Sequence, residues 1–187
     1  MQLLTVASAA VLTITPVVQA AQAKIYNKCS FKVYLWSVTA DHSSSMITLW
    51  PADIYNEIYQ VPSLGGVSLK LSITETITDS TPITQFEYTL AGDKIWYDIS
   101  NVNCAASSCP FQPYGLYMKS GLGCPTRSCI AGVPICTGAY NKPNDNENTL
   151  SCGGNSDISL YLCTEALSAF VSVSRTPRQL SSSTILC

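Results

Sequence analysis

The sequence has few charged residues and a single histidine. Charged residues make up 12% of the 187 positions, well below the roughly 25% of an ordinary soluble domain. Ten Lys and Arg stand against twelve Asp and Glu, giving a net charge of −2, so no basic excess exists for binding nucleic acid. His42 alone supplies too little for most hydrolytic triads and zinc sites. We therefore expect no cofactor, no metal and no nucleic-acid partner.

Beyond its N-terminus the sequence also lacks an apolar stretch long enough to span a membrane. Residues 1–23 carry no charged side chain, and their apolar run ends in Ala21-Gln22-Ala23, the small-residue pattern of a signal-peptide cleavage site. We predict a cleaved signal peptide of residues 1–23, with Ala20 as the alternative cleavage site, and one mature domain of residues 24–187. The mature protein is expected to be secreted, extracellular or associated with a cell wall, and free of the membrane.

Apolar and polar residues alternate with a period of two, which predicts β-strands rather than helices. In VSLKLSIT (67–74), Val67, Leu69 and Leu71 share one face, and Ser68 and Lys70 share the other. FKVYLWSV (31–38) is apolar on both faces, which predicts a central strand covered on both sides. Other expected strands are 54–61, 85–90, 95–100, 158–162 and 170–174. The pattern indicates an all-β domain of about eight to ten strands, arranged as a sandwich.

Segments 85–90 and 95–100 are predicted to form a hairpin with a four-residue loop, 91–94. Matching their apolar faces pairs Tyr88 with Tyr97. The same register puts Glu87 directly opposite Asp98 on the other face, next to Trp96. Like charges in that position destabilise a sheet, and a chain with so few charges need not place them there.

Three uses of the carboxylate pair remain open from the residues alone. First, Lys70 or another cation offsets the charges, and the pair has no chemical role. Second, the pair binds a cation or sugar hydroxyls, with Trp96 as a stacking platform. Third, the pair is catalytic, because retaining glycosidases hold two carboxyl groups about 5–5.5 Å apart.

Nine cysteines, all after residue 28, indicate an oxidising compartment and a disulfide framework. An odd number leaves at least one cysteine without a partner in its own chain, and the spacing leaves the pairing of the others open. Six cysteines and five prolines fall between residues 104 and 152, which predicts a disulfide-stapled loop region attached to the sandwich. The nine are Cys29, Cys104, Cys109, Cys124, Cys129, Cys136, Cys152, Cys163 and Cys187.

Several segments resemble thaumatin-like proteins, in the order in which that family has them. They are KIYNKCSFKVYLWSV (24–38), GGVSLKLSIT (65–74), EYTLAGDKIWYDISNVN (87–103) and GCPTRSC (123–129). The best match within the superfamily is the fungal Blastomyces yeast-phase-specific protein family, which shares the N-x-C-x-F-x-V-Y opening and the Y-D-I-S-N segment. The resemblance implies a thaumatin-like β-sandwich with a disulfide-rich loop extension. It also implies that the first and last cysteines pair, Cys29 with Cys187.

Thaumatin-like proteins often carry an acidic cleft of one Arg, one Glu and three Asp. Glu87 matches the cleft Glu and Asp98 matches one Asp, but Asn103 stands where a second Asp is expected. The cleft arginine falls at Lys70 or Leu71, so it is lost. The resemblance thus implies a degraded cleft.

We expect a secreted, non-enzymatic protein that binds cell-wall polysaccharide or an extracellular protein through Glu87, Trp96, Asp98 and Asn103. Two alternatives are a weak β-1,3-glucanase, with Glu87 as acid and Asp98 as second carboxylate, and an inhibitor of a secreted enzyme that acts through a rigid cysteine-rich loop.

Overall fold

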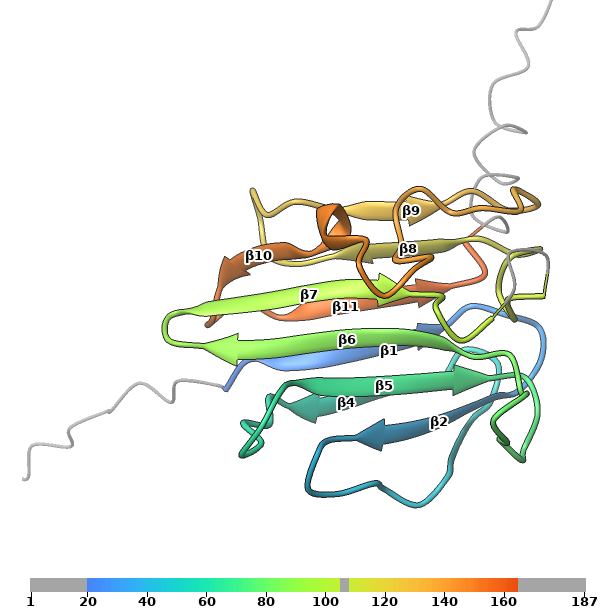
Figure 1. Cartoon of the computed structure of the whole chain (residues 1–187), viewed down its shortest axis with the longest axis horizontal. Helices are drawn as coiled ribbons and strands as arrows, with labels where there is room; N and C mark the ends of the chain where they lie inside the picture. The colour runs from blue at the N-terminus through green and yellow to red at the C-terminus, as the bar shows by residue number, and fades with distance from the viewer. Residues whose placement is uncertain (1–19, 105–107, 165–187) are drawn as a thin grey trace, which may run out of the picture.

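The protein is a sandwich of two β-sheets in the computed structural model, which describes residues 20–104 and 108–164 (Figure 1). A five-stranded sheet has the order β4-β1-β11-β8-β9, and a six-stranded sheet has the order β10-β7-β6-β5-β2-β3. The strands are β1 (Gln22–Asn27), β2 (Val33–Val38), β3 (Ile47–Leu49), β4 (Ile54–Ile58), β5 (Val67–Ser72), β6 (Thr84–Ala91), β7 (Lys94–Ser100), β8 (Leu116–Lys119), β9 (Arg127–Cys129), β10 (Leu150–Gly153) and β11 (Ile158–Leu162).

The predicted all-β sandwich is confirmed, with eleven strands among the described residues where eight to ten were expected. The cysteine-rich region contributes three of them, β8, β9 and β10, each of only three or four residues. The described residues hold one short 3-10 helix, η1 (Asn146–Asn148), and no helix among them is long and apolar enough to cross a membrane.

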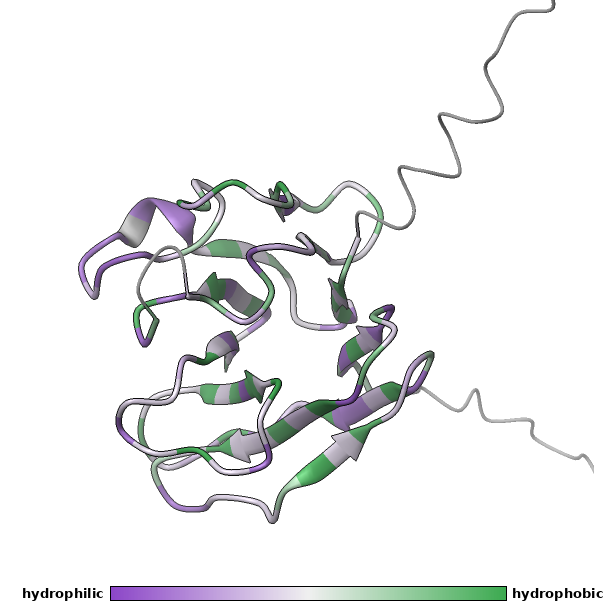
Figure 2. Ribbon diagram, turned by 90° about the vertical axis from the view of Figure 1, so that its right-hand side faces the viewer, coloured by the Kyte–Doolittle hydropathy of each residue, from purple (hydrophilic) through white to green (hydrophobic). Residues whose placement is uncertain are grey.

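The core lies between the sheets and is built from alternate residues of each strand. In β5, Val67, Leu69 and Leu71 are buried, whereas Ser68 and Lys70 are half-buried on the outer face. Figure 2 shows this alternation of apolar and polar residues along the strands. Burial of the two inner faces against each other removes apolar surface from water, the main stabilising effect in such sandwiches.

The register predicted for the β6–β7 hairpin is confirmed. Tyr88 pairs with Tyr97, and Glu87 pairs with Asp98. The ladder runs one pair further than expected, because Ala91 pairs with Lys94. The predicted four-residue loop is therefore wrong. A tighter turn closes the hairpin because Gly92 adopts φ +62°, a conformation that glycine takes at little cost.

The sequence predicted that β2 would be covered on both faces, and the structure differs from this prediction. It lies inside the six-stranded sheet, between β5 and β3, and Val33 and Leu35 are fully buried against the core. Trp36, on the other face, is only half-buried, so that face is not fully covered. The predicted strand 170–174 lies outside the described residues.

Four disulfides join the eight cysteines that lie in the described residues. They are Cys29–Cys163, Cys104–Cys109, Cys124–Cys152 and Cys129–Cys136. The predicted pairing of Cys29 with Cys187 is therefore wrong, and Cys187 lies outside the described residues.

Strand pairing explains why Cys163 is the disulfide partner of Cys29. Strands β1 and β11 are parallel neighbours that set Asn27 beside Leu162. Cys29 and Cys163 follow these two residues at the same end of the sheet, with their Cα atoms 5.0 Å apart.

A hydrogen-bonded carboxylate ties β4 of one sheet to β6 of the other. Glu57 accepts hydrogen bonds from the hydroxyls of Tyr88 at 2.6 Å and Tyr55 at 2.8 Å. It also accepts from Ser37 in β2 at 2.9 Å and from Gln60 at 3.0 Å. Burial and the hydrogen bond to Glu57 raise the pKa of Tyr88, so its hydroxyl stays protonated and keeps donating. This contact fixes β6 from its inner side.

The position of β1 leads to a prediction about signal-peptide cleavage. Gln22 N donates to Asp157 Oδ1 at 2.8 Å, and Ala23 is fully buried. Cleavage after Ala23 would remove both residues from the strand, whereas the alternative site after Ala20 keeps the strand whole. We expect N-terminal sequencing of the secreted protein to begin at Ala21. A start at Lys24 would contradict this expectation.

Candidate functional site

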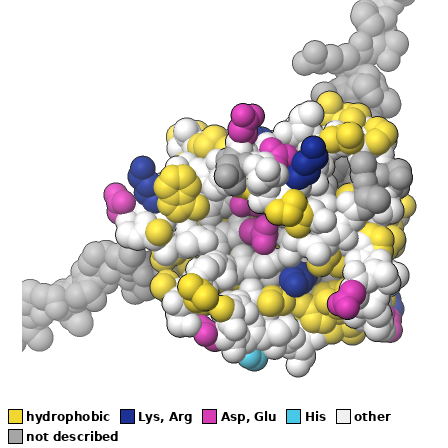
Figure 3. All heavy atoms as spheres, in the orientation of Figure 1, with side chains coloured by type: hydrophobic (Ala, Val, Ile, Leu, Met, Phe, Trp, Pro, Cys, Tyr) yellow, Lys and Arg dark blue, Asp and Glu magenta, His cyan; other side chains and the backbone are white. Residues whose placement is uncertain are grey.

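A groove of about 450 Å³ crosses the outer face of the six-stranded sheet, and we call it the acidic groove. Its lining includes Ser68, Lys70, Glu87, Trp96, Asp98 and Thr149. Figure 3 looks onto this face and shows acidic side chains at its centre, with basic and apolar side chains around them. Three of the four residues predicted to form the site, Glu87, Trp96 and Asp98, thus meet in one depression.

The strand register sets four residues of the acidic groove in a row across the sheet. Val38 of β2 pairs with Ser68 of β5, Ser68 pairs with Glu87 of β6, and Glu87 pairs with Asp98 of β7. Directly paired residues point to the same face of a sheet, with Cβ atoms about 4.5–5.5 Å apart. The row therefore follows from four strands held in register.

The surroundings of Asp98 in the acidic groove disfavour its charged form. Its Oδ1 is buried and has no hydrogen-bond partner among the described residues. Burial raises the pKa of Asp98 to about 7, and the charge of Glu87 adds to the rise. Near neutral pH the Asp98 carboxyl is thus divided between its protonated and ionised forms.

The ionised form of Glu87 is better stabilised by its neighbours than that of Asp98. Burial raises the pKa of Glu87, but the hydroxyls of Ser100 and Ser68 and the charge of Lys70 act in the opposite direction. Lys70 lies at the position where the arginine of the family cleft was expected, on the groove face, whereas Leu71 is in the core. A single proton on the pair therefore resides mainly on Asp98.

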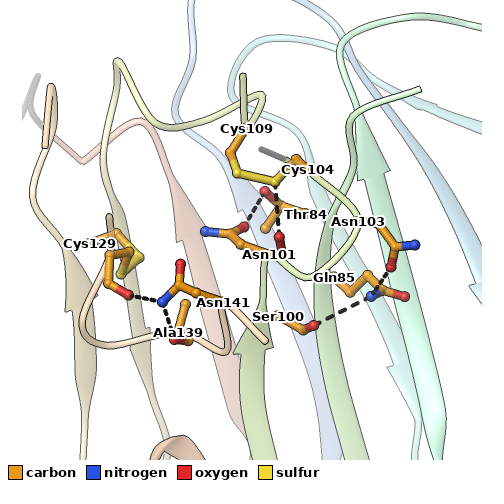
Figure 4. The surroundings of a disulfide bond; sticks show 11 residues. Thr84, Gln85, Ser100, Asn101, Asn103, Cys104, Cys109, Cys129, Ala139 and Asn141 are labelled. Atoms are coloured by element: carbon orange, nitrogen blue, oxygen red, sulfur yellow. Dashed lines mark hydrogen bonds between the residues drawn. A yellow bond between two sulfur atoms is a disulfide. The ribbon is translucent and has the colours of Figure 1, made fainter. Parts of the chain in front are cut away.

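Asn103, the fourth predicted site residue, does not line the acidic groove. It is exposed, and its Oδ1 accepts a hydrogen bond from Gln85 Nε2 at 2.9 Å. Gln85 lines the groove and also accepts from Ser68 Oγ at 2.9 Å. Figure 4 shows Asn103 and Ser100 on either side of Gln85, close to the Cys104–Cys109 disulfide. Asn103 therefore contacts a groove residue, Gln85, but is not itself part of the groove lining.

Trp96 forms one wall of the acidic groove. Its side chain is 41% exposed and lies opposite Thr89 in the hairpin register. Gly66 lies close to the same hairpin, where a Cβ atom would come within 2.2 Å of Thr89 Oγ1. A partly exposed aromatic ring beside carboxylates and hydroxyls can stack on a sugar ring while the polar groups bind its hydroxyls.

The sequence reasoning missed Gln85 and Thr149 as groove residues. The alternation of segment 85–90 puts Gln85 on the same face as Glu87, so that signal was present. Thr149 precedes β10, whose pairing with β7 had no local signal in the sequence. In the described residues no group of three or more His, Cys, Asp or Glu could hold a metal ion.

Comparison with known proteins places the chain among thaumatin-like proteins. Residues 10–164 match the family model described as "Blastomyces yeast-phase-specific protein". An antigenic thaumatin-like protein of Arthroderma benhamiae is 36% identical over 75% of this chain and 70% of its own length. A secreted thaumatin-like protein of Emericella nidulans is 32% identical over 75% of this chain and 80% of its own.

Two solved structures share the fold. The protein elicitor MoHrip2 of Magnaporthe oryzae superposes with a TM-score of 0.63 at 24% identity, over 77% of this chain and 99% of that chain. A thaumatin-like xylanase inhibitor superposes with a TM-score of 0.50 at 14% identity, over 75% of this chain and 98% of the inhibitor.

Proposed function

Because the chain belongs to the Blastomyces yeast-phase-specific protein family and is similar to two fungal thaumatin-like proteins, we propose a function for it outside the cell. It is a secreted, non-enzymatic protein that binds cell-wall polysaccharide in the acidic groove. Four disulfides and a relative named as secreted support an extracellular location.

One observation carries the binding proposal, namely the unpartnered Asp98 Oδ1 that lies in the same groove as Trp96. A buried carboxylate oxygen without a hydrogen bond is costly in the free protein. When the Asp98 carboxyl turns this oxygen toward the groove, a sugar hydroxyl can donate to it, while the Trp96 ring covers the apolar face of the sugar. Ligand binding therefore relieves a deficit that the free protein carries.

The test is a co-sedimentation assay with insoluble β-1,3-glucan, in which both bound protein and released reducing sugar are measured. We expect binding without sugar release. Trp96→Ala should weaken binding about thirtyfold or more, because an aromatic anchor commonly contributes about 2 kcal/mol or more. Trp50→Ala is the matched control, since Trp50 is 55% exposed in the turn before β4, where Lys32 Nζ lies 4.1 Å from its ring centre.

Sugar release that disappears in Glu87→Gln or Asp98→Asn would replace this proposal with the glucanase alternative. In that event Asp98 is the better proton donor, since its pKa of about 7 keeps a proton available near neutrality. The roles first assigned to Glu87 and Asp98 would then be exchanged.

A second candidate function, inhibition of a secreted enzyme, rests on the loop between Cys129 and Cys136. The disulfide closes this loop, which presents Ile130 at 71% and Ile135 at 57% exposure. A rigid loop with apolar side chains suits insertion into a protein partner. Loss of inhibition of a secreted glycosidase in an Ile130→Ser, Ile135→Ser double variant, with glucan binding absent in the unaltered protein, would favour this candidate.

A further inference from the structure

A second groove, of about 440 Å³, lies at the open edge of the sandwich, and we call it the edge groove. Strand β9 ends the five-stranded sheet, and β10, which follows η1, begins the six-stranded sheet. The edge groove lies between β9 and η1, in the upper part of Figure 1. No residue of the predicted site lines it.

The side chains that line the edge groove are polar and carry no net charge. Thr126, Ser128 and Thr137 contribute hydroxyls, Arg127 contributes a guanidinium and Glu147 a carboxylate. One cation and one anion cancel, so the lining favours a neutral ligand that is rich in hydroxyl groups over an anion. The grooves differ in kind, because no aromatic residue lines the edge groove.

Arg127 is held in place and still has donors to offer. Its Nη1 donates to Thr126 O at 3.2 Å, and its Nη2 donates to Glu147 O at 3.5 Å. These bonds occupy two of the five N–H donors of a guanidinium. The remaining donors can bind hydroxyl oxygens of a ligand in a fixed geometry.

Thr137 and Gly138, which also line the edge groove, are held in place as well. The Cys129–Cys136 disulfide ends directly before Thr137. Gly138 packs against β9 so closely that a Cβ atom would lie 2.7 Å from Ser128 O. A groove whose lining is held in place binds a ligand without a large ordering cost.

Three consecutive residues connect the linings of the two grooves, and we call this segment the ridge. Glu147 and Asn148 line the edge groove, and Thr149 lines the acidic groove. Asn148 Nδ2 donates to Ala139 O at 2.9 Å, and the Thr149 hydroxyl shares a hydrogen bond with Tyr140. Each groove has the volume of a site for one small ligand, so a ligand that fills both has to be a longer chain.

We propose that the edge groove is a second subsite for the same neutral polysaccharide that the acidic groove binds, reached by a chain that crosses the ridge at Thr149. This inference rests on the proposed function. It makes the protein selective for an extended chain: the acidic groove supplies stacking on Trp96, and the edge groove supplies hydrogen bonds from Arg127.

Calorimetric titration with soluble β-1,3-glucan oligosaccharides of two and six glucose units tests the inference. We expect the six-unit ligand to bind more tightly than the two-unit ligand. Arg127→Gln should weaken binding of the six-unit ligand about tenfold, the effect of one lost hydrogen bond to a charged group. Binding of the two-unit ligand should be unchanged. Thr137→Val, at an exposed position, should reduce six-unit binding in the same direction if Arg127→Gln does not fold.

The matched control is Lys119→Gln, which removes one positive charge from an exposed side chain whose Nζ lies 5.4 Å from the Tyr161 ring centre, outside both grooves. This variant should bind both ligands as the unaltered protein does. Equal affinities for the two ligands, or equal losses for both in Arg127→Gln, would overturn the second subsite and leave the proposed function standing. Absence of binding to either ligand would overturn both.

Discussion

Asp98→Asn should stabilise the protein at pH 8 and leave its stability unchanged at pH 4. Burial and the charge of Glu87 raise the Asp98 pKa from its usual value to about 7 in the folded protein. Asn resembles the neutral acid in shape, and it has no charge to bury. The variant therefore differs from the unaltered protein only where Asp98 is ionised.

The direction of this effect follows from proton linkage. Because the folded-state pKa is raised, the unfolded chain loses the Asp98 proton first as the pH rises, and folding stability falls between about pH 4 and pH 7. A pKa raised to about 7 lowers the free energy of unfolding by about 4 kcal/mol at pH 8, where Asp98 is ionised. For a protein of this size, the melting temperature should rise by on the order of 10 °C.

Thermal unfolding at a series of pH values from 4 to 8 checks this expectation. Asp93→Asn is the matched control, since it makes the same change at an exposed position in the turn of the same hairpin. A gain for Asp98→Asn that is equal at every pH would show that the carboxyl is not held protonated by its surroundings. A lowered glucan affinity in the same variant would connect the cost of this carboxylate with ligand binding.

Replacement of both Cys29 and Cys163 by serine should be the most destabilising of the disulfide removals. The bond joins residues 134 positions apart, and loop-closure entropy gives about 5 kcal/mol for a loop of that length. The Cys104–Cys109 bond spans only five positions, so its removal should cost about 2 kcal/mol by the same relation.

Chemical unfolding of the two double variants measures this difference. Neither variant adds an unpaired thiol, because both partners of the bond are replaced, so the comparison isolates the length of the closed loop. Peptide mapping without reduction should also recover a peptide pair that carries Cys29 and Cys163. A peptide pair that carries Cys29 and Cys187 would contradict the pairing seen in the structure.

Local patterns were sufficient to predict much of the site. The alternation in segments 85–90 and 95–100 fixed which residues face the core, and that choice determines the pairing of Glu87 with Asp98. The hairpin is a contact between neighbours in sequence, so the periodicity of two segments and a short turn contain the needed information.

The parts that the sequence did not predict depend on contacts between distant segments. Thr149 reaches the acidic groove because β10 pairs with β7, and Cys163 meets Cys29 because β11 lies parallel to β1. Neither pairing has a local signal in the sequence. Strand β10 is a four-residue edge strand that is not joined to β7 by a turn. Strands β1 and β11 are parallel neighbours more than 130 residues apart, so no turn joins them either. The edge groove was missed for the same reason.

The parallel pairing of β1 with β11 also has a consequence for how the chain acquires its fold. Strand β1 lies between β4 and β11, the last described strand, so the five-stranded sheet cannot close until β11 has been synthesised. Contacts of such high sequence separation slow folding. Until β11 has been synthesised, one edge of β1 has no partner strand, and an exposed strand edge of this kind is prone to aggregation. The five-stranded sheet is therefore expected to close late in folding, after β11 has been synthesised.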